Sequence, residues 1–159
     1  AAEGGPELLV LFPVVLLELE QLVFDLLLQG VGDDLQLAGM LEQAGTPTQL
    51  LDLARCDMAE AVAQAFRFSK LVLATPTYNA DVFPFMKEFI HHLTERNYQN
   101  RTGAFIENGS WAPMAAKVMT KMLEGSKNLT YAATTVTVRG ALNAASEAQL
   151  AALADELSR

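Results

Sequence analysis

From Arg55 to the C-terminus, short apolar or β-branched runs alternate with stretches of helical periodicity, and this alternation constrains the fold more than any other feature. Parallel strands need a crossover connection, which is usually a helix, so the rhythm predicts a parallel sheet with helices on both faces. A chain of 159 residues amounts to one domain. We therefore predict a single α/β domain with strands at Gln49–Leu53, Lys70–Ala74, Thr102–Ile106 and Leu129–Val138.

The predicted helices carry recognisable start signals. Asp57 and Glu60 have the spacing of a capping box. Asp81 is expected to cap a long helix, which tolerates Pro84 in its first turn. Further expected features are the apolar stripe Met86, Phe89, Ile90 and Leu93, a helix from Pro113 to Leu123, and a final helix capped by Ser146.

The N-terminal third admits two interpretations. In the first, Leu8–Phe12 is a strand, which Pro13 prevents from extending as a central strand, and Val14–Gln29 is a helix with one polar edge. In the second, Gln21–Leu28 is the first strand and Gly30–Asp34 is its loop. The first interpretation ends its helix at Gly30 and places a second helix to about Ala44, with Asp33 or Asp34 as its cap; the sequence does not separate the two interpretations.

Charge and composition exclude several classes of protein. The first 54 residues hold nine acidic residues and no lysine or arginine, so the basic footprint of a nucleic-acid-binding protein is absent. The apolar run Leu8–Leu17 is flanked by Glu7 and Glu18 and lacks the basic start of a signal peptide, so we expect no membrane association. Cys56 is the only cysteine, which suits a reducing compartment, and we predict a cytoplasmic protein with Cys56 as a core filler.

Two unusual loops follow predicted strands. The first is Thr75-Pro76-Thr77-Tyr78-Asn79, and the second is Asn108-Gly109-Ser110-Trp111-Ala112-Pro113. In open parallel sheets, ligands bind beyond the carboxyl ends of the strands. Backbone amides, small polar side chains and one aromatic ring in each loop suit a flat heteroaromatic ligand. The alternative is that both are ordinary turns, with Trp111 covering the core and Tyr78 lying on the surface.

Two segments carry a family resemblance. LVLATPTYNADVFPFMKEF and RNYQNRTGAFIENGSWAPMAAKVM resemble the flavodoxin-like domain of A-type flavoproteins, the flavodiiron proteins. The resemblance covers residues 50–157 and does not include the N-terminal third. It implies a flavodoxin-like three-layer sandwich over residues 1–159, with a five-stranded parallel sheet of order 2-1-3-4-5 and an atypical region at residues 1–47. It also implies FMN as cofactor and transfer of electrons to a diiron centre.

The resemblance assigns the ring-binding residues by position. The first loop would border the isoalloxazine ring, and Ala80 stands where the family usually has a second asparagine. In the second loop Trp111 would stack on the ring. The residues that the resemblance assigns to the cofactor are Thr75, Pro76, Thr77, Tyr78, Asn79, Ala80, Asn108, Gly109, Ser110 and Trp111.

The sequence departs from the family in two places. The two histidines, His91 and His92, are neighbours on a predicted helix and point about 100° apart, so we expect no diiron site and no autonomous oxygen or nitric oxide reductase activity. The family's phosphate loop, rich in Ser, Thr and Gly, is not recognisable, because no Ser or Thr precedes Thr46. The nearest candidate, Gly30–Asp34, carries two carboxylates of the wrong sign for a phosphate.

Three functions are compatible with these residues. The first is an FMN-binding electron-transfer domain that serves a separate redox partner, a diiron or reductase protein. The second is a flavodoxin-fold scaffold or homodimerisation domain that has lost FMN. The third, an NAD(P)H-dependent flavin or quinone reductase, is the least supported, because no dinucleotide fingerprint is visible.

Overall fold

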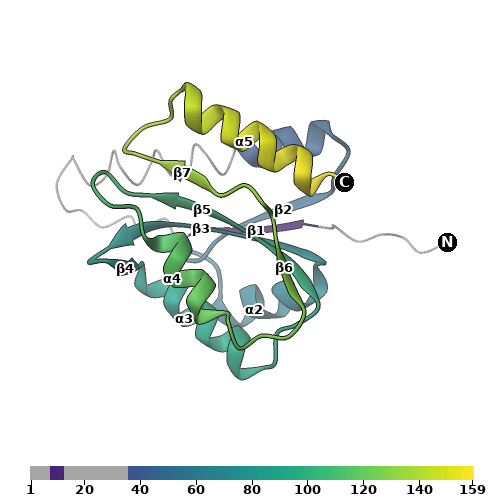
Figure 1. Cartoon of the computed structure of the whole chain (residues 1–159). Coiled ribbons are helices and arrows are strands. Elements are labelled where there is room, and N and C mark those ends of the chain that lie inside the picture. The colour runs from purple at the N-terminus through teal and green to yellow at the C-terminus, as the bar shows by residue number, and fades with distance from the viewer. Residues whose placement is uncertain (1–7, 13–35) are drawn as a thin grey trace.

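A computed structural model describes residues 8–12 and 36–159, and its helices and strands alternate as expected (Figure 1). Residues 36–43 are helical. The strands are β1 (Leu8–Phe12), β2 (Thr48–Asp52), β3 (Lys70–Tyr78), β4 (Asp81–Val82), β5 (Arg101–Asn108), β6 (Leu129–Tyr131) and β7 (Val136–Val138). The helices are α2 (Met58–Arg67), α3 (Pro84–Glu95), α4 (Ala115–Met122) and α5 (Ala144–Leu157).

The described strands form one mostly parallel sheet. Its order is β2-β1-β3-β5-β6, with β7 parallel to β5 and the two-residue β4 antiparallel to β3. The predicted α/β class is confirmed, whereas the predicted set of five strands in the order 2-1-3-4-5 is not: the described sheet has seven strands. Two additions cause the difference, namely β4 and the division of the predicted strand Leu129–Val138 into β6 and β7.

Helices cover both faces of the sheet and make three layers (Figure 1). On one face α2, α3 and α4 pack against alternate residues of the central strands, such as Leu71, Leu73 and Phe105. On the other face α5 and the helix at residues 36–43 pack against the intervening residues, such as Val72 and Ile106. A strand with both faces buried carries an unbroken apolar run, which is why LVLA in β3 is entirely buried.

Several local predictions are confirmed. The side chain of Asp57 accepts a hydrogen bond from the backbone N–H of Glu60 (3.0 Å) and caps α2. The whole predicted stripe of α3 is buried: Met86, Phe89, Ile90 and Leu93. Within the described ranges, no helix is both long enough and apolar enough to span a membrane.

Three predicted helix starts are wrong. Asp81 lies in β4, and α3 begins after Phe83, with Pro84 in its first turn. Asn143 rather than Ser146 caps α5, because Ser146 is the third helical residue and completes the capping box. The fourth helix begins at Ala115, after the cap residue Met114, and not at Pro113.

The N-terminal strand of the first interpretation is confirmed. β1 lies between β2 and β3, parallel to both, and Leu11 is in register with Leu51 and Leu73. It ends at Phe12, the residue before Pro13. The predicted helix Val14–Gln29, the alternative strand Gln21–Leu28 and the loop Gly30–Asp34 lie outside the described residues.

Candidate functional site

The two predicted loops come together at one edge of the sheet. Strands β3 and β5 are parallel neighbours, with Thr75 in register with Glu107 and Pro76 in register with Asn108. Their carboxyl ends therefore meet, at the left of the molecule in Figure 1. This is the edge at which open parallel sheets bind ligands.

The first loop is a β-hairpin rather than a turn alone. Strand β3 runs on through Tyr78, and Thr77 pairs with Val82 on β4. The turn itself is Asn79-Ala80, whose φ angles of 50° and 57° are those of a two-residue hairpin turn. Asparagine tolerates this left-handed conformation better than alanine does, which gives a physical reason for a second asparagine at the position of Ala80.

Polar and aromatic contacts hold the hairpin against the start of α3. The Asp81 carboxylate lies 2.6 Å from the Lys87 ammonium and accepts the N–H of Val82. The hydrogen bond from Lys87 holds the pKa of Asp81 below its ordinary value. The Tyr78 ring lies edge-on to Phe83, with centroids 5.7 Å apart, and Tyr78 is 52% exposed. Tyr78 therefore presents open ring surface at the edge of the sheet.

The second loop is fixed at its first residue and open at its tip. The N–H of Gly109 donates to the carbonyl of Val138 (3.0 Å). A Cβ at this glycine would lie 3.1 Å from Pro113 Cα and 3.3 Å from Thr77 Oγ1, so the two loops touch here. Trp111 is 97% exposed, which overturns the alternative in which it covers the core.

Asn108, the last residue of β5, holds an unused hydrogen-bond donor. The residue is 6% exposed, and its side-chain oxygen accepts the N–H of Gly140 (3.3 Å). That contact fixes the orientation of the amide, because the reverse orientation would bring two donors together. The Nδ2 group of Asn108 is buried and has no partner, so it needs an acceptor from a ligand or from water.

The ten predicted residues divide into two groups in the structure. Tyr78, Asn79, Ala80, Ser110 and Trp111 are exposed at the edge of the sheet. Thr75 and Asn108 are buried, whereas Pro76, Thr77 and Gly109 are partly buried and line the junction of the two loops.

These residues fit the ring of a flavin. Tyr78 and Trp111 offer aromatic surface, and the Asn108 amide offers a donor for a ring oxygen or nitrogen. The stretch that would follow β1 and hold a phosphate, residues 13–35, lies outside the described residues.

Sequence reasoning missed two residues of this edge. Glu107, at the end of β5, is 8% exposed and bonded to α4 and β7. Gly140, in the left-handed region with φ of 84°, begins a third loop beside Asn108. A charged residue directly before the Asn-Gly-Ser-Trp loop was the available signal for Glu107, whereas only the pairing of β7 with β5 places Gly140 here.

The histidines do not form a metal site in the described part of the chain. His92 lies 3.7 Å from Glu88 and 3.8 Å from Glu95, and both contacts are on the surface of α3. Residues 8–12 and 36–159 hold no group of three or more His, Cys, Asp or Glu side chains arranged to bind a metal ion.

Cys56 is expected to react slowly with alkylating agents. Burial, followed by the negative charges of Asp52, Asp57 and Glu60, raises the pKa of the thiol, and the thiolate is the reactive form. Alkylation by iodoacetamide, followed by mass spectrometry, should be slower than that of free cysteine at neutral pH. The rate should still be rising above about pH 8.5, where an ordinary thiol is half ionised. A rate at neutral pH equal to that of free cysteine would contradict this expectation.

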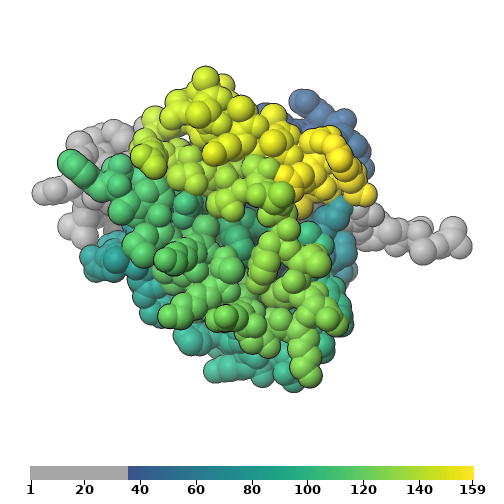
Figure 2. Space-filling view, in the orientation of Figure 1, coloured from purple at the N-terminus to yellow at the C-terminus, as the bar shows by residue number. Residues whose placement is uncertain are grey.

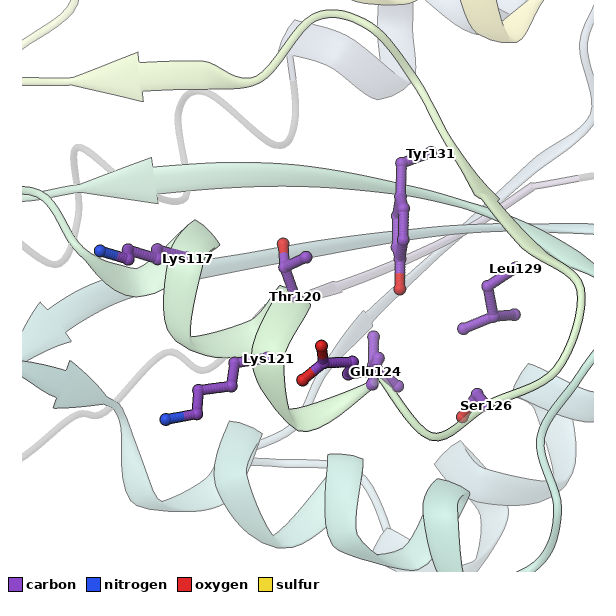
Figure 3. Close-up of a pocket in the computed structure, with 8 residues that line it drawn as sticks. Lys117, Thr120, Lys121, Glu124, Ser126, Leu129 and Tyr131 are labelled. Atoms are coloured by element: carbon purple, nitrogen blue, oxygen red, sulfur yellow. The ribbon is translucent and has the colours of Figure 1, made fainter.

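A separate hollow of about 640 Å³ lies between α4 and β6, on the face turned toward the viewer in Figure 2. Lys117, Thr120 and Lys121 reach it from α4, Glu124 lies just after the end of that helix, and Leu129 and Tyr131 reach it from β6 (Figure 3). The ring of Tyr131 lies over Gly103, where a Cβ would come within 3.1 Å of it. None of the ten predicted residues lines this hollow, so it is distinct from the site at the carboxyl edge.

A comparison with protein-family models and with curated proteins found no match, but solved structures do match. The rubredoxin oxygen:oxidoreductase of Desulfovibrio gigas superposes with a TM-score of 0.83 over 98% of this chain at 17% identity. The flavodiiron protein of Giardia intestinalis superposes with a TM-score of 0.70 over 96% of this chain at 13% identity. A flavodoxin from Archaea superposes with a TM-score of 0.70 over 96% of this chain at 11% identity.

The matches differ in how much of each relative the chain covers. It spans 36% of the Desulfovibrio and Giardia proteins but 99% of the archaeal flavodoxin. The chain therefore has the flavodoxin-like α/β fold that flavodoxins share with about a third of a flavodiiron protein, and the resemblance expected from its two loops is confirmed at the level of the fold.

Proposed function

We propose that this chain is an FMN-binding electron-transfer domain. The observation that carries the proposal is the meeting of the Tyr78 hairpin and the Trp111 loop at the carboxyl edge of the sheet, with both rings exposed. FMN bound there would supply one- and two-electron transfer, which no side chain of the described region provides on its own.

The chain's own residues would bind and orient the ring. Trp111 would stack on the ring, Tyr78 would border it, and Asn108 would donate to its polar edge. We further propose that the strand order becomes 2-1-3-4-5 when β4 is taken as part of the hairpin and β6 with β7 as one interrupted strand.

The proposal also includes a redox partner protein and a cellular compartment. A redox carrier without substrate chemistry of its own needs a separate protein to accept or supply electrons, and we propose a diiron or reductase protein for this role. We propose a single domain that acts in the cytoplasm and binds neither nucleic acid nor membrane.

One feature of the sequence, the missing phosphate loop, favours a second function, that of a scaffold. The absence of Ser and Thr before Thr46 leaves no recognisable phosphate loop, which suits a scaffold or homodimer of this fold that has lost FMN.

A fluorescence titration with FMN and with riboflavin tests both functions. Because FMN differs from riboflavin only by its phosphate, the ratio of the two dissociation constants reports on a phosphate site alone. We expect the protein to quench the fluorescence of both ligands. The two dissociation constants should be similar, because the ring loops are intact and the phosphate loop is not recognisable. Binding of neither ligand to the folded protein would exclude the electron-transfer function and favour the scaffold.

A further inference from the structure

Helix α4 begins without a capping side chain of its own. Its cap residue is Met114, and its first turn holds no acidic residue. The first four N–H groups of a helix have no partner within the helix, so they must be satisfied from elsewhere. The residues that satisfy them here come from the ends of two strands.

Thr77 and Glu107 supply the missing acceptors. Thr77 Oγ1, on β3, accepts the N–H of Met114 at 3.0 Å and that of Ala115 at 3.3 Å. Glu107 Oε2, on β5, accepts the N–H of Ala116 at 2.9 Å. We call this pair of residues the Thr77–Glu107 anchor.

Glu107 is itself held in place. Its second oxygen, Oε1, accepts the hydroxyl of Thr137 on β7 at 3.0 Å, and its side chain is almost fully buried. A buried carboxylate with both oxygens bonded has a fixed orientation, and its negative charge suits the positive end of the α4 dipole. The anchor therefore joins β3, β5 and β7 to one helix end.

The anchor fixes the far end of the Trp111 loop. The near end is fixed by the bond from Gly109 to Val138 and by the close approach of Gly109 to Thr77 and Pro113. The loop of residues 109–113 is thus tied at both ends, although Trp111 at its tip is almost fully exposed.

We propose that Thr77 and Glu107 are positioning residues that hold the 109–113 loop in one conformation before any ligand binds, so that Trp111 is ready to stack. The use of that loop for a flavin rests on the proposed function. A preformed loop loses less conformational freedom on binding and so binds more tightly than a mobile one.

Trp111 is itself the reporter for the test. It is the only tryptophan of the chain, so its fluorescence anisotropy reports the mobility of this loop in the flavin-free protein. We expect Glu107→Ala and Thr77→Val to lower the anisotropy of Trp111 and to weaken FMN binding by about tenfold. Thr77→Ser keeps the acceptor hydroxyl, and Glu107→Gln keeps one acceptor oxygen for the Ala116 N–H while its amide can donate to the Thr137 hydroxyl, so both variants should restore both values.

Asp57→Ala is the matched control. Asp57 also caps a helix through its carboxylate, but it does so on α2, and its loss should leave both the Trp111 anisotropy and FMN binding unchanged. Unchanged anisotropy in folded Glu107→Ala and Thr77→Val proteins would overturn the anchor. A drop in anisotropy in a chain that binds no flavin even as wild type would uphold the anchor and reject the proposed function, so the two failures are distinguishable.

Discussion

Replacing Trp111 with alanine is expected to weaken FMN binding about tenfold or more while the free energy of unfolding stays unchanged. A ring stacked on a planar heterocycle contributes about 1–3 kcal/mol, and about 1.4 kcal/mol corresponds to a factor of ten in the dissociation constant. Stability should change by less than about 0.5 kcal/mol, because Trp111 is 97% exposed and has little contact to lose. Fluorescence titration with FMN and urea unfolding of the same preparation measure the two quantities.

Trp111→Phe is the control for the contribution of ring stacking to FMN affinity. It keeps an aromatic face at the same position, so it should retain much of the affinity that alanine loses. If the folded Trp111→Ala protein binds FMN as tightly as the wild type, Trp111 does not belong to the site.

Replacing Phe89 with alanine is expected to lower the free energy of unfolding by about 3–5 kcal/mol. Phe89 is fully buried on α3, within the core that joins α2, α3 and α4 to the sheet. Its removal leaves a cavity that the packed neighbours only partly fill. A loss of this size is a large fraction of the roughly 5–15 kcal/mol that holds a domain together. Denaturant unfolding followed by circular dichroism measures it.

Phe85→Ala provides the comparison on the same helix. Phe85 lies one turn earlier, is 36% exposed and contacts Phe83 with ring centroids 5.7 Å apart. We expect this change to cost clearly less stability than Phe89→Ala, because a smaller part of the ring leaves an apolar environment. Equal losses for the two variants would show that burial does not set the contribution of these rings.

Local chemistry explains which sequence predictions were right. The apolar stripe of α3 was predicted because apolar residues at helical spacing must face a core. Asp57 was predicted as the cap of α2 because its side chain can reach an N–H of the first helical turn. The two loops were identified because polar and aromatic residues directly follow buried strands.

The predictions that failed depended on contacts that the residues around each helix start do not reveal. Asp81 has the sequence position of a helix cap, but pairing of β4 with β3 uses it in a hairpin instead. Pro113 has the sequence position of a helix start, yet α4 begins two residues later. It begins where Thr77 and Glu107 accept hydrogen bonds from backbone N–H groups. Thr77 lies 37 positions before Met114, so its part in starting α4 leaves no local pattern in the chain.

The sequence by itself determined the alternation of strands and helices, the buried face of α3 and the pair of loops that end β3 and β5, because each follows from residues within one or two turns of one another. Only the tertiary structure decided that Trp111 is exposed, that Asn108 keeps an unused donor and that Glu107 and Thr77 fix the start of α4. These properties arise where strands far apart in sequence lie side by side, since burial and hydrogen-bond satisfaction are set by whatever the fold brings next to each side chain.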